Sequence, residues 1–263
     1  MALIVLTSAN GSPGVTTTAL GLATNWPRPV VLVEADPTGA SGIAAGYFRG
    51  TLPPGQTIVD LAMSHRQGTL ATDLPQLLVE MPGTENVHVL PGPLRHTQAR
   101  ALENVWEPLA GALKALEANG QDVIVDAGRL GLEGYATRLL TGADLAVLLT
   151  RSTLPGVVGA RSWSATLREM FTRAGAESSL ALGVVGPGMP YSAANVAKVL
   201  DLPVTTSLAW DPPAAEVFSR GATPPRRFAS SNLVRSLSAG VEAIQAHISD
   251  TRRSLGLEEG IAR

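Results

Sequence analysis

The sequence contains no cysteine, and only Lys114 and Lys198 among its 20 basic residues are lysines. The absence of cysteine excludes disulfides, thiolate nucleophiles and cysteine-ligated metal sites, and it is compatible with the cytosol. A formal net charge of -2 gives no reason to expect bulk attraction to nucleic acid or to acidic membranes. The apolar start, residues 1–7, lacks a basic leader, and no later apolar run is long enough to span a bilayer. We therefore expect a soluble cytoplasmic protein without stable membrane insertion.

Short apolar runs bounded by turn residues predict buried strands at 3–6, 30–33, 87–90, 123–125, 145–149, 180–185 and 204–208. Their hydrophobicity is continuous rather than alternating, which is typical of strands covered on both faces. Helical periodicity separates several of them, as in 110–118 and 190–200. The last helix would carry Leu233, Leu237, Val241, Ile244 and Ile248 on one face. We expect an α/β fold, doubly wound around a mostly parallel sheet.

The chain is expected to form one domain over residues 1–250, followed by a C-terminal tail at 251–263. Residues 37–86 are rich in Gly, Pro and Thr, which predicts loops and short helices beside the sheet. Residues 224–227 are expected to form an exposed loop before the last helix. The four histidines lack the spacing of metal ligands.

A glycine-rich segment, residues 8–18, joins the first predicted strand to a helical segment. In such a turn, backbone N–H groups and a helix N-terminus converge on an anion. The candidate cofactor-binding residues are Gly11, Ser12, Gly14, Val15, Thr16 and Thr17. The segment alone fits a plain strand-to-helix turn equally well, because Ala9 and Val15 occupy the positions of the first glycine and the lysine in G-x-x-x-x-G-K-[ST].

Carboxylates stand at the ends of two further predicted strands. Glu34 and Asp36 follow the second strand, and Asp126 follows the strand at 123–125. A carboxylate there can orient water near a terminal phosphate, which makes Asp36 the candidate catalytic residue. Thr16 and Asp126 are the candidate Mg²⁺ ligands if a nucleotide binds. Each acid alone is more often a solvated strand-end residue or a helix cap, but the three features in this order favour a nucleotide site.

Three segments, at 10–17, 34–37 and 124–126, resemble in order and spacing the motifs of the MinD/ParA family of deviant Walker A P-loop ATPases, of the SIMIBI class. The resemblance covers nearly the whole chain. It implies a P-loop NTPase-like fold, ATP and Mg²⁺ as cofactors, a homodimer around the nucleotide, and a role in positioning cargo, septum or chromosome complexes in bacterial cells.

The sequence departs from that family at both of its loop lysines, which are Val15 and Asn10 here. A unit charge about 4 Å from another is worth roughly 4 kcal/mol at an effective dielectric constant of about 20, so the loss is large. Ser12 replaces a glycine, and Pro13 removes one backbone N–H from the loop. The asparagine that reads adenine in the family is absent, because Gly186-Pro-Gly188 follows the strand at 180–185. The resemblance is therefore to a degenerate member.

The leading hypothesis is a degenerate MinD/ParA-like pseudo-ATPase that acts with a protein partner as a dimerising scaffold or regulator. Pilus or secretion-system assembly, cell division and chromosome partitioning are the candidate settings. The main alternative is an active ATPase of this type that recruits a replacement cation, such as an arginine from a distant segment. A nucleotide-independent interaction protein also stays open, and an ATP-dependent ligase or synthase ranks third. DNA contact through Arg226 and Arg227 is less favoured than solvated loop arginines, given the net charge.

Overall fold

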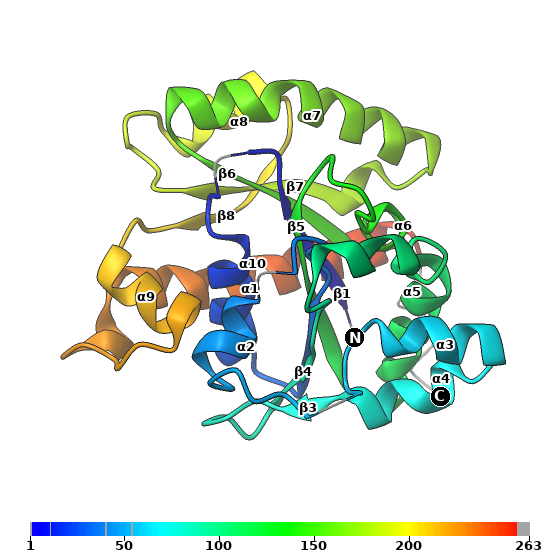
Figure 1. Ribbon diagram of the computed structural model, residues 1–263. Helices are drawn as coiled ribbons and strands as arrows, with labels where there is room; N and C mark the ends of the chain where they lie inside the picture. The colour runs from blue at the N-terminus through cyan, green and yellow to red at the C-terminus, as the bar shows by residue number, and fades with distance from the viewer. Residues whose placement is uncertain (1, 11, 40, 54, 257–263) are drawn as a thin grey trace.

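The computed structural model describes residues 2–10, 12–39, 41–53 and 55–256 (Figure 1). Its centre is an eight-stranded sheet with the order β3-β4-β2-β5-β1-β6-β7-β8. The strands are β1 (Leu3–Ser8), β2 (Val30–Glu34), β3 (Val79–Glu80), β4 (Val87–Leu90), β5 (Asp122–Arg129), β6 (Leu145–Arg151), β7 (Leu180–Val185) and β8 (Val204–Leu208). All seven expected strands are present, and they pair in parallel with one another. The sequence analysis missed β3, a two-residue antiparallel edge strand that is too short to have a pattern.

Helices connect the strands and cover both faces of the sheet. They are α1 (Val15–Thr24), α2 (Gly42–Gly46), α3 (Asp60–Gln67), α4 (Leu70–Asp73), α5 (Trp106–Ala115), α6 (Thr137–Thr141), α7 (Leu154–Arg173), α8 (Ala193–Leu200), α9 (Pro212–Arg220) and α10 (Asn232–Ser254). Short 3₁₀ helices lie at Leu74–Leu77, His96–Leu102, Leu116–Asn119, Glu177–Ser179 and Phe228–Ser230. The doubly wound architecture is confirmed.

Two apolar cores lie on opposite faces of the sheet. One core contains α1, α2, α9 and α10, and the other contains α3 to α8. Figure 1 shows α7 and α8 together as one layer, with α1 and α10 on the other side of the strands. The five apolar residues expected on one face of the last helix are all buried in α10. The strands are almost fully enclosed, which explains their continuous apolar sequences.

Helix boundaries differ from the expected ones where local capping decides them. The helix expected at 190–200 begins only at Ala193, because the Ser192 side chain accepts a hydrogen bond from Asn195 N at 3.2 Å and caps it. The helix expected at 110–118 begins earlier, at Trp106, and gives way to a 3₁₀ turn after Ala115. Helix α10 continues to Ser254, past the expected end of the domain at 250, and residues 257–263 of the tail lie outside the described residues. None of the described helices is both long and apolar enough to cross a membrane.

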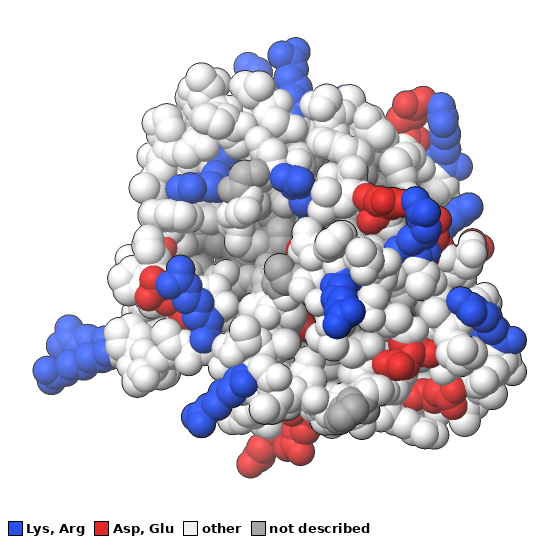
Figure 2. Space-filling view, in the orientation of Figure 1, with Lys and Arg blue, Asp and Glu red and all other residues white. Residues whose placement is uncertain are grey.

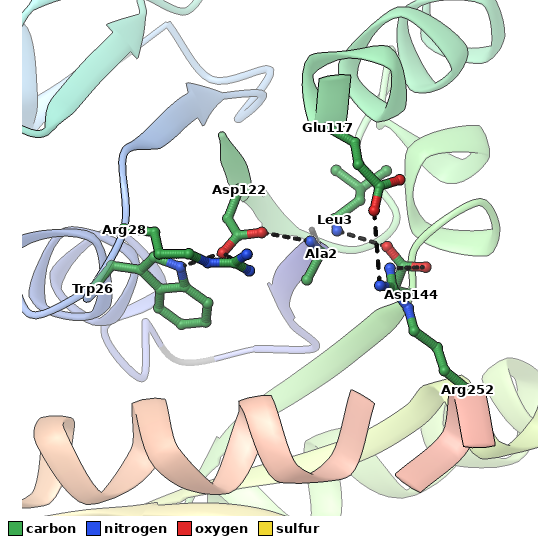
Figure 3. A network of polar contacts seen from close by, with 8 residues as sticks. All are labelled: Ala2, Leu3, Trp26, Arg28, Glu117, Asp122, Asp144 and Arg252. Atoms are coloured by element: carbon green, nitrogen blue, oxygen red, sulfur yellow. Dashed lines mark hydrogen bonds and ion pairs between the residues drawn. The ribbon is translucent and has the colours of Figure 1, made fainter. Parts of the chain in front are cut away.

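The carboxylates of Asp122 and Asp144 bind the start of β1, at the end of the strands opposite the glycine-rich loop (Figure 3). Asp122 is fully buried and accepts hydrogen bonds from Ala2 N at 2.6 Å, Trp26 Nε1 at 2.7 Å and Arg28 Nη2 at 2.6 Å. Asp144 accepts one from Leu3 N at 2.7 Å. These contacts join β1, β5 and the segment after α1 in one network.

We expect Asp122→Ala to lower the free energy of unfolding by about 3 kcal/mol. The substitution leaves the buried N–H groups of Ala2 and Trp26 without an acceptor and removes the partner of the Arg28 guanidinium. Urea unfolding followed by circular dichroism measures this. The control is Asp250→Ala, which removes an exposed carboxylate paired with Arg253 at 2.9 Å and should cost less than about 1 kcal/mol. Equal effects of the two substitutions would contradict a structural role of this network.

Candidate functional site

The glycine-rich loop connects β1 to α1 and ends in an uncapped helix. Gly14 is the residue before the helix, has φ 96° and ψ 45°, and offers no side chain as a cap. The first N–H groups of α1 therefore have no partner within the helix and face the loop. No acidic residue lies in the first turn. This arrangement is suited to an anion, since both the N–H groups and the helix dipole favour negative charge.

The residues at the two lysine positions are both held within the protein. Val15 is buried in the apolar core below α1. The Asn10 side chain donates a hydrogen bond to Pro155 O of α7 at 3.0 Å. Gly159 makes room for it, because a Cβ there would lie 1.8 Å from Asn10 Nδ2. Ser12 has φ 45°, so the position does need a left-handed conformation, as the glycine-to-serine departure suggested.

The predicted acids gather beside this loop: Asp36 follows β2, and Asp126 lies within β5, which continues to Arg129, past the expected end at 125. Asp126 is buried, and its carboxylate accepts hydrogen bonds from Gly128 N at 3.0 Å and from the Thr16 side chain. Asp36 is half-buried and accepts a hydrogen bond from Thr38 N at 2.9 Å. A small cavity of about 20 Å³ lies between Thr16, Asp36 and Asp126. That volume holds one water molecule or ion.

Glu34 links the two neighbouring loops that contain Ser41 and Gly92. Its carboxylate accepts hydrogen bonds from Ser41 Oγ and from Gly92 N. Burial raises the pKa of Glu34 to about 7, against these hydrogen bonds, and the charges of Asp126 and Asp36 raise it further. Burial likewise raises the pKa of Asp126 to about 6, against the hydrogen bond from Thr16. A cation bound here would favour the ionised forms.

A larger cavity of about 620 Å³ opens along the loop, which is a typical volume for a small-molecule site. The expected site residues Ser12, Gly14, Val15, Thr16, Thr17 and Asp36 all line it. Gly11 lies outside the described residues, and Asp126 lines the adjacent small cavity. The structure thus brings the described candidate site residues together. Arg226 and Arg227 line a separate hollow before α10.

The far wall of the large cavity contains residues that the sequence analysis did not select. Trp210, just after β8, is 42% exposed there, and the Arg151 guanidinium lies 3.9 Å from its ring centroid. Arg129 and Arg220 also line the cavity. Figure 2 shows basic side chains on more than one side of the hollow between α9 and the α7–α8 layer. The sequence provided no signal for these residues, because two strands, the segment after a third strand and a helix carry them far apart in the chain.

Among the described residues, no group of three His, Cys, Asp or Glu side chains is placed to hold a metal ion. Mg²⁺ usually takes only one or two protein carboxylates and completes its coordination with water and substrate phosphates. Thr16 and Asp126 lie next to each other at the small cavity and fit that limited role.

The site and the sheet together define a doubly wound α/β protein whose first strand is followed by a glycine-rich loop suited to binding an anion. In the solved structures, that class is represented by the cell-division ATPase MinD of Pyrococcus furiosus, with 19% identity, a TM-score of 0.70 and coverage of 94% of this chain and 99% of the other. MinD of Pyrococcus horikoshii, complexed with Mg-ADP, has 18% identity, a TM-score of 0.68 and coverage of 99% and 100%.

A ParA-family ATPase of Chlorobium tepidum has 12% identity, a TM-score of 0.71 and coverage of 92% and 99%. The chain therefore has the MinD/ParA fold over almost its whole length, which confirms the fold expected from the resemblance. No protein-family model and no curated protein sequence matches the chain.

We expect the unfolding free energy to fall as pH rises from about 4.5 to 7, because the folded protein holds protons on Glu34 that the unfolded chain releases. Glu34→Gln should make this dependence shallower than in the unmodified protein. Urea unfolding at several pH values measures it. The exposed Glu80 provides the matched control, Glu80→Gln. A steep fall that persists unchanged in Glu34→Gln would show that Glu34 does not titrate in this range.

Proposed function

We propose that the chain is a MinD/ParA-like protein that binds Mg-ATP with weak or absent hydrolysis and acts as a dimerising scaffold or regulator in bacterial spatial organisation. The supporting observation is the cavity of about 620 Å³, which runs from the loop hydroxyls of Thr16 and Thr17 to the half-exposed ring of Trp210. Anion-binding groups at one end and an aromatic surface at the other match the two ends of a nucleotide.

The phosphate end would be held by the α1 N-terminus and by the hydroxyls of Thr16 and Thr17. Thr16 and Asp126 would hold Mg²⁺, and Asp36 occupies the place of the water-orienting acid. When bound, Mg²⁺ supplies positive charge to the phosphates. MinD of Pyrococcus horikoshii, which shares the fold, is described as a Mg-ADP complex. We infer the same ligand class here.

Weak turnover follows from what occupies the lysine positions. Hydrolysis needs positive charge at the phosphoryl oxygens where negative charge develops. Val15 and Asn10 are uncharged, so neither brings a positive charge to the loop, and both side chains are held within the protein, Val15 in the core and Asn10 by a hydrogen bond to α7. Binding survives such a loss more readily than catalysis, because backbone N–H groups and Mg²⁺ still contact the phosphates.

A protein partner is supported by the surface beside the loop. Leu154 and Val158 of α7 are 58% and 61% exposed, on either side of Pro155, the residue that Asn10 contacts. We propose that both the second copy of the homodimer and the unidentified partner bind at this surface of α7. Cell division and chromosome partitioning remain the proposed settings, in line with the MinD and ParA names of the structural neighbours, together with pilus or secretion assembly.

Calorimetric titration with Mg-ATP tests the phosphate end. We expect the unmodified protein to bind and Thr16→Ala to weaken binding about tenfold, because it removes a hydroxyl from the metal and phosphate site. Thr172→Ala removes an exposed hydroxyl of α7 and is the matched control. Phosphate release by the unmodified protein should not exceed that of Asp36→Ala. Absence of Mg-ATP binding, or brisk turnover that is lost in Asp36→Ala, would contradict the proposal.

Trp210→Ala tests the base end of the cavity. We expect it to weaken Mg-ATP binding about tenfold, because stacking on an aromatic ring is worth about 1–3 kcal/mol per base, and to leave the binding of pyrophosphate unchanged. Trp163→Ala, at a half-buried tryptophan outside the cavity, controls for loss of an aromatic ring. Equal loss for both ligands would argue that Trp210 supports the structure of the cavity and does not contact the base.

A further inference from the structure

The pairing of β1 with β5 shifts by one residue at the loop end. Leu6 of β1 is paired with Asp126 of β5, and Ser8 of β1 is paired with Arg129 of β5. Between these two pairs, β1 advances by two residues and β5 by three. Strand β5 therefore contains a bulge, and its Gly128 has φ 62°. Because paired residues on neighbouring strands point to the same face, the extra residue places Arg129 on the face of Leu6 and Asp126. That is the face covered by α1.

Several contacts hold the bulge in place. The Tyr135 hydroxyl donates a hydrogen bond to Thr7 Oγ1 at 2.7 Å, and Thr7 Oγ1 donates to Gly128 O at 3.2 Å. The Asp36 carboxyl group packs directly on Gly128, because a Cβ built on Gly128 would lie 2.4 Å from Asp36 Cγ. Without the extra residue, the alternation of the strand would send Arg129 to the opposite face of the sheet. The bulge thus fixes where this arginine emerges.

The Arg129 side chain is exposed and lines the large cavity together with Ser12, Thr16 and Thr17. Within the described residues it has no hydrogen-bond or ion-pair partner. Of the other arginines near the cavity, Arg220 has the exposed Glu216 at 3.8 Å, and Arg151 lies over the ring of Trp210. Of the two described arginines that line the cavity, Arg129 is the one without an acidic partner, and it lines the cavity together with the loop hydroxyls.

We propose that Arg129 binds phosphate groups at the α1 N-terminus and supplies, from strand β5, the positive charge that the loop itself lacks. The ligand is a di- or triphosphate, whether carried by a nucleotide or free as pyrophosphate. A guanidinium suits this role because its fork of N–H donors engages two phosphate oxygens at once and is always charged. The nucleotide form of this ligand rests on the function proposed above, whereas the phosphate contact does not.

Calorimetric titration of the full chain with Mg-ATP and, separately, with pyrophosphate tests the proposal. We expect Arg129→Ala to weaken both about tenfold or more, because a charge-assisted hydrogen bond to each is lost. Arg129→Lys should recover much of the affinity, since it restores the charge without the fork. The affinity of Arg129→Ala should also depend less on salt concentration than that of the unmodified protein.

The matched control is Arg66→Ala, which removes an exposed arginine of α3 that lies outside the cavity. It should bind both ligands like the unmodified protein. Circular dichroism and urea unfolding of each variant show whether the fold is intact, and Arg129→Lys serves as the second variant if Arg129→Ala unfolds. Unchanged affinity in Arg129→Ala, or an equal loss in Arg66→Ala, overturns the proposal.

The two ligands separate this inference from the proposed function. Binding of Mg-ATP that is lost in Thr16→Ala but not in Arg129→Ala would support the function and overturn the role of Arg129. Binding of pyrophosphate that depends on Arg129, without binding of Mg-ATP, would support the phosphate contact and contradict the nucleotide function. A protein that binds neither ligand overturns both.

Discussion

The contact between the Asp36 carboxyl group and Gly128 determines how the site is assembled. It joins the loop after β2 to the bulge of β5 at a point where only glycine leaves enough space. On one side of this contact lies the buried Asp126 with Thr16, and on the other lies Arg129 at the cavity. The acids and the cation of the site are thus positioned by backbone geometry around a single residue. A side chain at position 128 would separate the loops that carry them.

The sequence predicted the parts of the site that depend on chain order. Most of the strands were recognised because they are enclosed on both faces and are therefore largely apolar. Thr16, Asp36 and Asp126 were recognised because they lie at or beyond the carboxyl ends of apolar segments of parallel strands, which meet on one side of the sheet. Arg129 was not selected, because regular alternation does not reveal a bulge, and nothing in residues 126–129 fixes its position without the neighbouring strand. Trp210 was missed for a related reason: its exposure depends on how β8 and α9 surround the cavity.

The electrostatics of the site differ between its two ends. Around the small cavity, burial removes hydration from the carboxyl groups of Glu34 and Asp126, and nearby acids repel them, so their pKa values rise to about 7 and about 6. Around the large cavity, Arg129 has no acidic partner among the described residues, and Glu216 neutralises only part of the charge of Arg220. A polyphosphate bound together with Mg²⁺, as proposed above, would bring the cation to the acids and the anion to Arg129. The ligand charges therefore complement both ends of the site.

The position of Arg129 also explains why binding and hydrolysis need not go together. The charge lost at Val15 belongs inside the loop, whereas Arg129 emerges from the adjacent strand and its side chain is exposed. An exposed cation contributes well to affinity and salt dependence, but it stabilises a transition state less than a group that the loop holds rigidly, because preorganisation is the larger part of catalytic electrostatics. Asn10, at the other lysine position, also supplies no charge for hydrolysis, and its side chain is hydrogen-bonded to α7. Under the proposed function, this arrangement would favour a bound state that persists, which is the property that a scaffold or regulator requires.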